Sequence, residues 1–95
     1  MKIKFSHNYN KLSGVKNNKA VLIEVIPVKM ENLHKPFLDY DTDNGKFYLP
    51  KLGIYLLLIF NSGGFIFTTI RRQTPEKKKY YDGCIGQEFD VEVVE

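Results

Sequence analysis

Apolar residues in this chain gather in short runs of the kind that form β-strands. Residues 20–28 (AVLIEVIPV) are dense in Val and Ile, with Glu24 as their one charge, and residues 65–72 (FIFTTIRR) are rich in Phe, Ile and Thr. Lys2–Phe5 and Gln87–Val94 instead alternate polar with apolar positions, which predicts strands with one buried face and one face in water. Patterning alone therefore predicts four strands.

Leu49–Phe60 is a segment whose pattern fits both a helix and a strand. Its apolar residues fall at helical spacing, Pro50 suits a first helical turn, and a glycine after the run suits a C-terminal cap. The alternative is a hairpin in which residues 54–60 pair with residues 65–71 across Asn61–Gly64. Because leucine favours helices, we expect the helix.

Shorter elements are expected between these segments. Thr74 suits an N-cap, with proline and glutamate following, so a short helix is predicted from there to Tyr81. Residues 31–38 suggest another short helix, and residues 39–45 (DYDTDNG) a turn-rich acidic loop. We expect residues 1–95 to form one α+β domain, mostly β: a small mixed β-barrel with one to three short helices, since a barrel leaves no strand edge unpaired.

Residues 52–70 carry no charge, and this run is long enough for a transmembrane helix. Asn61–Gly64 places polar and helix-breaking residues in its middle, so we expect two elements joined by a turn and no membrane partner. Residues 1–11 are polar and basic and lack the apolar run of a secretion signal. The single cysteine, Cys84, cannot form an internal disulfide, which is compatible with a reducing compartment. A cytoplasmic location is therefore expected.

Positive charge is concentrated in two segments, although the net charge is only +3. Residues 1–35 carry seven lysines against two glutamates, and residues 71–81 carry five basic residues against Glu76, whereas the last predicted strand is acidic. The chain is not a polycation, but a basic face formed by these two segments would attract an anion.

The candidate binding residues follow directly from the 65–72 run. Arg71 and Arg72 are neighbours on a strand, so they point to opposite faces and at most one can enter a given cleft. A guanidinium there can clamp a phosphate or a base edge; the alternative is an ion pair with an acid such as Glu88. The other candidates would supply hydrogen bonds, positive charge, a stacking face or a proton shuttle, and they are Thr68, Thr69, Lys77, Lys78, Lys79, Tyr80 and His7.

The sequence predicts no metal site and no cofactor. Asp39, Asp41 and Asp43 are spaced like calcium ligands, but Asn44 stands where such a loop needs glycine and Pro50 where it needs glutamate. The two histidines are distant in the sequence, which is weak support for a metal site.

Several segments together resemble the PUA-like superfamily, in particular its small ASCH-type domains. They are residues 4–12 (KFSHNYNKL), 67–72 (FTTIRR), 80–86 (YYDGCIG) with 88–93 (EFDVEV), 20–28 and 37–42 (FLDYDT). In such domains the threonine–arginine strand normally comes early, so the blocks of this chain look exchanged, as in a circular permutation. The lysine–glutamate motif that many members carry near their N-terminus is not evident.

The resemblance implies a pseudo-barrel whose cleft binds RNA, with Thr68, Thr69, Arg71 and Arg72 as the best-matching residues. We therefore expect an RNA- or nucleotide-binding module that needs no catalysis. One alternative is a small hydrolase acting on RNA or modified nucleosides, as a few relatives are, using a threonine, His7 and a lysine. Another is a protein-interaction module that dimerises through the apolar Leu52–Phe60.

Overall fold

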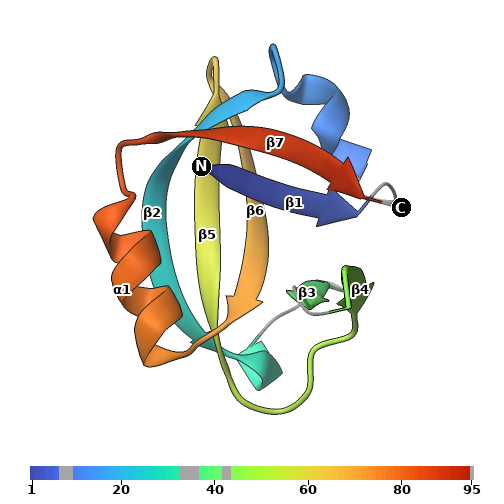
Figure 1. Cartoon of the computed structure of the whole chain (residues 1–95), viewed down its shortest axis with the longest axis vertical. Helices are drawn as coiled ribbons and strands as arrows, with labels where there is room; N and C mark the ends of the chain where they lie inside the picture. The colour runs from blue at the N-terminus through green and yellow to red at the C-terminus, as the bar shows by residue number, and fades with distance from the viewer. Residues whose placement is uncertain (7–9, 33–36, 42–43, 95) are drawn as a thin grey trace.

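The computed structural model describes residues 1–6, 10–32, 37–41 and 44–94. Its main feature is a five-stranded mixed sheet with the order β1-β7-β2-β5-β6, in which β1 and β7 are parallel and the other neighbours antiparallel (Figure 1). The strands of this sheet are β1 (Lys2–Ser6), β2 (Lys19–Lys29), β5 (Ile54–Ser62), β6 (Phe65–Arg72) and β7 (Glu88–Val94). The other described elements are the hairpin of β3 (Asp39–Asp41) and β4 (Lys46–Tyr48), the helix α1 (Pro75–Gly83), and the 3-10 helices η1 (Asn10–Gly14) and η2 (Met30–Asn32).

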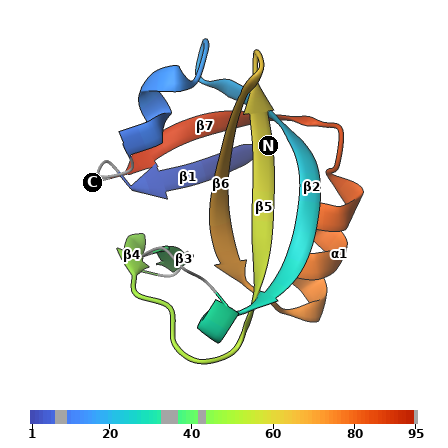
Figure 2. The same ribbon diagram turned by 180° about the vertical axis from the view of Figure 1, so that it is seen from behind.

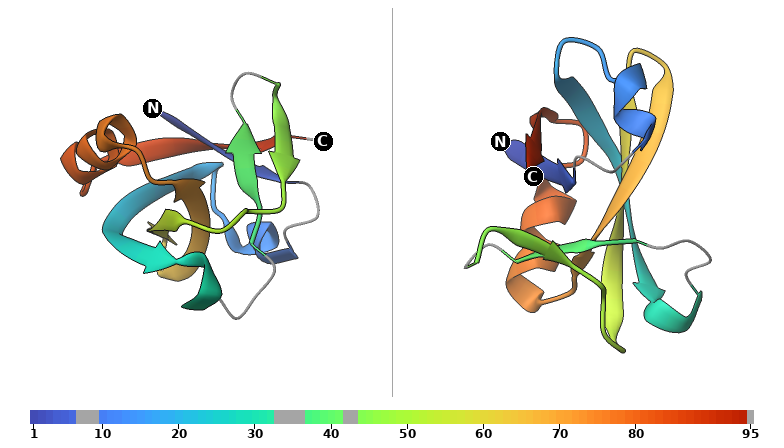
Figure 3. Two further views of the ribbon diagram at one scale, coloured as in Figure 1. Left: turned by 90° about the horizontal axis from the view of Figure 1, so that it is seen from below. Right: turned by 90° about the vertical axis from the view of Figure 1, so that its right-hand side faces the viewer.

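The sheet folds over itself, and β2 is the strand that turns between its two halves. β2 pairs with β7 over Lys19–Val21 and with β5 over Val21–Lys29. A β-bulge between Leu22 and Glu24 adds the local bend that this change of partner needs. Figures 1 and 3 show β1 and β7 running across the β5–β6 hairpin, and Figure 2 shows the same hairpin with β2 from the opposite side. The two halves therefore form two layers with the core between them.

Aromatic rings from both layers meet at the centre of the core. Phe60 on β5 is fully buried, and its ring centroid lies 6.4 Å from that of Phe5, 5.6 Å from that of Phe67 and 5.4 Å from that of Phe89. These partners belong to β1, β6 and β7. One ring thus holds four strands of the sheet together, by area burial and by edge-to-face and stacked contacts.

A side chain joins the two edges of the sheet. β1 and β6 are the edge strands, and no backbone ladder connects them among the described residues, so the predicted closed barrel is not confirmed. Arg71 on β6 instead donates a hydrogen bond from Nη2 to the carbonyl oxygen of Lys4 on β1, at 2.6 Å. The rings of Phe5 and Phe67, from the same two strands, lie 5.3 Å apart. The described residues are mostly in β-strands, as predicted, and α1 is the α-helix among them.

The prediction of a helix over Leu49–Phe60 is wrong, because most of this run is the strand β5. β5 pairs with β2 along one edge and with β6 along the other. Its inner face is fully buried at Leu56, Leu58 and Phe60 and its other face is half-buried, and such a nearly continuous apolar run has the same sequence pattern as a buried helix segment. The turn to β6 contains Gly63 and Gly64 with φ of +58° and +93°, which glycine adopts without strain and a tight hairpin requires. In the part of the chain that the structure describes, no helix has the length and apolar character needed to cross a bilayer.

The apolar run predicted as a dimer face is divided between the core and the surface. Leu56, Leu58 and Phe60 are fully buried inside the chain's own core. Leu52 and Ile54, at the start of the run, are 82% and 49% exposed. Dimerisation stays a prediction, and a dimer contact through this run would have to use its exposed start or the half-buried Leu57 and Ile59.

The other predicted elements compare as follows with the structure. The four strands predicted from patterning are confirmed as β1, β2, β6 and β7. The helix predicted after Thr74 is confirmed as α1. Thr74 caps its first turn by accepting a hydrogen bond from the backbone N–H of Lys77 at 3.1 Å. The helix predicted at residues 31–38 begins as η2, and its residues 33–36 lie outside the described residues. The acidic loop predicted at residues 39–45 begins instead with β3, because a hairpin joins it to β4.

Three of the seven lysines of the predicted N-terminal basic face, Lys2, Lys4 and Lys19, pair with two acidic residues of β7, so part of this charge is neutralised. Lys4 Nζ lies 3.0 Å from Glu92 Oε1, and Lys2 Nζ lies 3.9 Å from Glu92 Oε2. Lys19 forms an ion pair with Asp90. Hydrogen bonds from Lys19 and Lys4 hold the pKa of Asp90 and of Glu92 below the ordinary values of 3.8 and 4.5.

These ion pairs predict how stability changes in acid. A carboxylate whose pKa is lower in the folded state stabilises the fold above its unfolded pKa, and this contribution is lost as the pH falls through the folded value. We expect the melting temperature to fall below about pH 4, and to fall less in the double variant Asp90→Asn, Glu92→Gln. Thermal melting followed by circular dichroism at several pH values checks this. High salt should reduce the difference between the two proteins, because it screens exposed pairs. Parallel pH curves at low salt would contradict the prediction.

Candidate functional site

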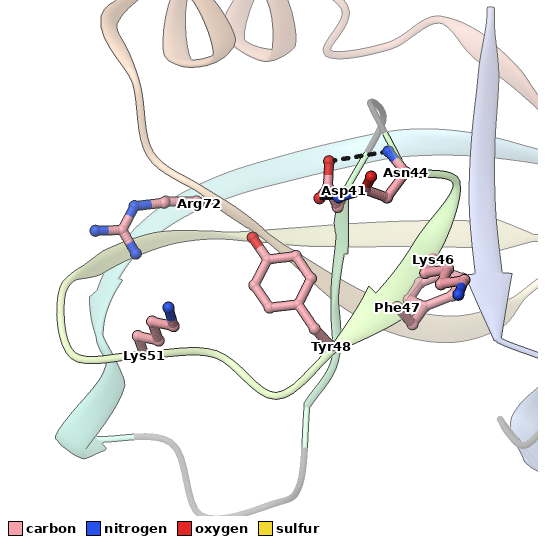
Figure 4. Close-up of a pocket in the computed structure, with 7 residues that line it drawn as sticks. All are labelled: Asp41, Asn44, Lys46, Phe47, Tyr48, Lys51 and Arg72. Carbon is pink, nitrogen blue, oxygen red and sulfur yellow. Dashed lines mark hydrogen bonds between the residues drawn. The ribbon is translucent and has the colours of Figure 1, made fainter.

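An open pocket of about 880 Å³ lies between the β3–β4 hairpin, residues 49–53 and the end of β6. Its lining combines basic, aromatic, acidic and amide side chains, namely Asp41, Asn44, Lys46, Phe47, Tyr48, Lys51 and Arg72 (Figure 4). Three of these residues are cations, and one is an anion. The pocket is the candidate functional site.

The hairpin that forms one wall of the pocket follows from a local signal in the sequence. Asn-Gly at positions 44 and 45 is the dipeptide most typical of tight hairpin turns. Gly45 has φ of +65°, and its backbone N–H donates to the carbonyl oxygen of Asp41 at 2.8 Å. The Asn44 side chain donates from Nδ2 to Oδ2 of Asp41 at 2.6 Å. These bonds close the turn and fix the Asp41 carboxylate.

Arg72 and Lys51 form the positive end of the pocket. Figure 4 shows both on one side of the Tyr48 ring, with Asp41 and Asn44 on the other. The guanidinium of Arg72 lies 5.8 Å from the centroid of the Tyr55 ring, and its Nη1 donates to the Tyr55 hydroxyl at 3.3 Å. A guanidinium has five N–H donors, so one that is oriented by such contacts can also bind an anion.

A buried carboxylate fixes the tyrosine in the middle of the pocket. Tyr48 donates from its hydroxyl to Oδ2 of Asp39 at 2.7 Å, and Asp39 is fully buried. Asp39 also accepts from the backbone N–H of Tyr40 at 2.8 Å and of Arg72 at 3.3 Å. Burial, together with the hydrogen bond to Asp39, raises the pKa of Tyr48 to about 12, so the phenol stays protonated at neutral pH. The ring is thereby held in one orientation, as a stacking surface needs.

Aromatic contacts attach the hairpin to the sheet. The rings of Tyr40 and Phe47, which are partners across β3 and β4, lie 4.9 Å apart. The guanidinium of Arg71 lies 5.9 Å from the Tyr40 ring and 6.0 Å from the Phe47 ring. Cation–π attraction at these distances links the hairpin to β6. The position of the pocket wall therefore depends on Arg71.

The two candidate arginines have separate roles in the structure. Arg72 is exposed and lines the pocket, whereas Arg71 is 4% exposed, which confirms that the two point to opposite faces. Arg71 Nη1 donates to Oγ1 of Thr69 at 3.0 Å and to the carbonyl oxygen of Ile70 at 2.6 Å. Burial lowers the pKa of Arg71. Arg71 is thus an internal bridge, and of the two arginines Arg72 is the one whose side chain lines the pocket.

The remaining sequence candidates are not brought together at this pocket. Thr69 is buried against Arg71, and Thr68 lies half-buried on the opposite face of β6. The basic and aromatic candidates of α1 do not line the pocket, and they are Lys77, Lys78, Lys79 and Tyr80. His7 lies outside the described residues.

Two of the helix candidates have partners within α1. Lys78 Nζ lies 2.7 Å from Oδ2 of Asp82, one turn further along the helix. The Tyr80 ring lies 5.1 Å from the Tyr81 ring in an edge-to-face contact. The Lys78 and Tyr80 side chains therefore lie on a part of the surface away from the pocket.

Sequence reasoning missed most of the pocket, although signals for it were present. Asp41 enters the sequence-based prediction only through the acidic loop and a calcium-like spacing that fails, and Lys46, Tyr48 and Lys51 do not enter it. The Asn-Gly turn followed by the alternating Lys46–Tyr48 is typical of a hairpin. Such a hairpin places one cation and one ring on the same face.

Comparisons with protein-family models, with curated proteins and with solved structures found no match to this chain. Within the described residues, no group of three or more His, Cys, Asp or Glu side chains is arranged to hold a metal ion. A function can therefore be inferred only from what the side chains of the pocket can bind.

Proposed function

We propose that this chain is an RNA- or nucleotide-binding module that needs no catalysis, and that its ligand occupies the pocket between the β3–β4 hairpin and the end of β6. One observation carries the proposal. Arg72 and Lys51 stand beside the fixed ring of Tyr48 in one open pocket of about 880 Å³. A cationic pair beside a flat ring matches a ligand that joins a phosphate to a base.

The cations and the ring would take different parts of such a ligand. Arg72 offers a planar fork of donors that fits two phosphate oxygens, and Lys51 adds a point charge. Tyr48 offers a face on which a base can stack, and such stacking contributes about 1–3 kcal/mol per base. The hydrogen bond from Tyr48 to the buried Asp39 supports this role, because a ring that is already oriented loses little entropy on binding.

The fold that accompanies this function is, in our proposal, a PUA-like pseudo-barrel of the ASCH type with its blocks exchanged. The motifs described above carry that resemblance. The bridge from Arg71 on one edge strand to Lys4 on the other supports it, since the sheet edges approach one another without a backbone ladder. In this proposal Arg71 has a structural role and Arg72 binds the ligand.

Removing the two cations beside the ring is expected to weaken binding selectively. The double variant Lys51→Ala, Arg72→Ala should bind a 5′-phosphorylated RNA oligonucleotide at least about a hundredfold more weakly, because two charged hydrogen bonds of about 1.5–3 kcal/mol each are lost. The slope of log affinity against log salt should fall by about 1–2. Fluorescence anisotropy titrations at several salt concentrations measure both quantities.

A second pair of lysines provides the matched control for this experiment. Lys77→Ala, Lys79→Ala removes the same charge from α1, away from the pocket. We expect this variant to keep at least a third of the affinity, because long-range attraction alone is screened by salt. Equal losses in the two double variants would mean that net charge, and not the pocket, binds the RNA.

A further inference from the structure

Two leucines of the loop between β4 and β5 are the most exposed large apolar side chains of the described residues. Leu49 is 70% exposed and Leu52 is 82% exposed, whereas the other exposed apolar side chains range from 42% to 52%. A hollow of about 220 Å³ between Leu52, Met30 and Ile54 extends this apolar surface. Figure 1 shows the loop at one end of the long axis of the molecule. We call residues 49–54 together with Met30 the apolar tip.

Hydrogen bonds on both sides of Leu52 hold the tip in this conformation. The carbonyl oxygen of Lys51 accepts from the Tyr55 hydroxyl at 2.9 Å. The carbonyl oxygen of Gly53 accepts from the backbone N–H of Met30 at 3.0 Å. The exposure of Leu52 is therefore a feature of a fixed backbone. Leu49 and Leu52 do not line the pocket between the hairpin and β6, so the proposed function does not explain their exposure.

Three cations stand beside the apolar tip. Lys51 is part of the loop, and Lys29 borders the hollow. A Cβ added at Gly53 would lie 3.5 Å from Nη2 of Arg72, so this guanidinium lies against the loop. The three cations are exposed, and none of them forms an ion pair with a described residue. Glu31 borders the same hollow as Lys29 and offsets part of this charge.

Charge and shape decide among the candidate occupants of the tip. In a symmetric contact between two copies of the chain, each cation would approach the cations of the other copy, which opposes a dimer. A peptide or a small ligand needs a groove or a larger pocket, since ligand pockets have about 300–1,000 Å³. The surface of a bilayer needs neither. It accepts a protruding apolar segment, and its anionic lipids attract the cations beside that segment.

We infer that the apolar tip binds the surface of anionic membranes, with Leu49 and Leu52 entering the headgroup region and the three cations contacting lipid phosphates. This binding goes beyond the proposed nucleotide site, with which it shares Lys51 and Arg72 but not the leucines. We expected no membrane partner because a turn interrupts the apolar residues 52–70. That expectation concerns spanning segments, and binding at a bilayer surface needs none.

The expected affinity is modest. Each basic residue near an anionic surface contributes about a fivefold gain. Each leucine that enters the interface contributes about a tenfold gain. Three cations, partly offset by one acid, and two leucines together give an association constant of about 10³–10⁴ M⁻¹, at most that of a single myristoyl chain. Binding should therefore be reversible and should weaken as salt is raised.

A single tryptophan at the tip tests whether this loop enters the lipid. The chain contains no tryptophan, so the fluorescence of Leu52→Trp reports on the tip alone. We expect its emission to shift to shorter wavelength with vesicles of phosphatidylcholine and phosphatidylserine, but not with phosphatidylcholine alone, because tryptophan prefers the bilayer interface and the cations need anionic lipid. Ile85→Trp, between α1 and β7, is the control and should show no shift.

Sedimentation with the same vesicles measures the affinity. Leu49→Ser, Leu52→Ser should bind the anionic vesicles about a hundredfold more weakly. It should stay folded, because both side chains are exposed, and circular dichroism melting checks this. Its affinity for RNA should be unchanged, since neither leucine lines the pocket. The control Ile66→Ser, Ile85→Ser removes two apolar side chains that are each 47% exposed, and it should bind vesicles like the unaltered chain.

Other results would overturn the inference. Equal vesicle binding by the leucine variant and the unaltered chain would mean that charge alone attracts the protein. A dimer in place of vesicle binding, detected by light scattering and lost in the leucine variant, would assign the tip to a second copy. Neither vesicle binding nor a dimer would leave a protein partner as its occupant. RNA titrations contain no lipid, so their failure would reject the nucleotide site and leave the membrane result unaffected.

Discussion

Replacing Phe60 with alanine is expected to lower the free energy of unfolding by about 3–5 kcal/mol, the usual cost of removing a fully buried aromatic ring. Phe60 is completely buried and its ring contacts three others, those of Phe5, Phe67 and Phe89. The cavity would lie where both layers of the sheet meet. Domains of this size have about 5–15 kcal/mol of total stability, so the variant should lose a large part of it. Urea denaturation followed by circular dichroism measures the change.

Two milder substitutions separate the loss of this ring from a general sensitivity of the sheet. Phe60→Leu keeps most of the volume and should cost less than about 2 kcal/mol. Ile66→Ala on β6 removes an apolar side chain that is 47% exposed, and it should cost about 0.5 kcal/mol. A similar cost for Phe60→Ala and Ile66→Ala would show that the ring cluster does not hold the two layers together.

The parts of the fold that sequence could predict are those with local causes. β6 was predicted with the boundaries that the structure shows, because a β-branched and aromatic run lies between a double glycine and a proline-containing cap. The start of α1 was predicted because Thr74 and the proline after it act within one turn. β7 was predicted because alternation reports directly which residues face the core.

The strand β5 could not be predicted from its own residues. Its leucines and its helical spacing favour a helix, whereas its pairing with β2 and with β6 depends on residues far away in the sequence. A run that is apolar on both faces looks the same in a buried strand and in a buried helix. Gly63 and Gly64 did carry the hairpin signal, but it competed with a helix cap that uses the same glycine.

Of the residues that line the candidate site, only Arg72 was predicted from the sequence. As with β5, the rest of the site depends on contacts between residues that are distant in the sequence. Alternation showed that Arg71 and Arg72 must diverge, but it could not show which of them is inside. That choice depends on β3, whose Asp39 and Tyr40 cover the end of β6. Lys51 and Tyr48 reach the same pocket from other segments, and no spacing in the sequence reports such a meeting.

The pocket and the closure of the sheet are connected through Asp39 and Arg71. Asp39 holds Tyr48 through its hydroxyl and Arg72 through its backbone N–H, and so positions the ring and one cation. The negative charge of Asp39 favours the charged form of the buried Arg71. Arg71 in turn bonds to Lys4 across the sheet edges. The wall of the pocket therefore depends on two buried residues of opposite charge, Asp39 and Arg71, and not on the loop alone.

The substitution Arg71→Met tests this connection. Methionine fills a similar space but leaves the Thr69 hydroxyl and the carbonyl oxygens of Lys4 and Ile70 without their donor, and it leaves Asp39 without its nearby cation. Breaking a buried charged network by removing one member costs about 3–5 kcal/mol. We expect a loss of this size in urea denaturation.

The neighbouring arginine supplies the matched control for the Arg71 substitution. Arg72→Met makes the same change on an exposed side chain that contacts the Tyr55 hydroxyl and ring, and it should cost less than about 1 kcal/mol of stability. Its effect should appear in ligand affinity, which isolates anion binding from folding. Similar losses of stability in the two variants would remove the division of roles between the arginines. We expect a large loss of stability in Arg71→Met alone and, if the proposed function holds, a loss of affinity in a fully folded Arg72→Met.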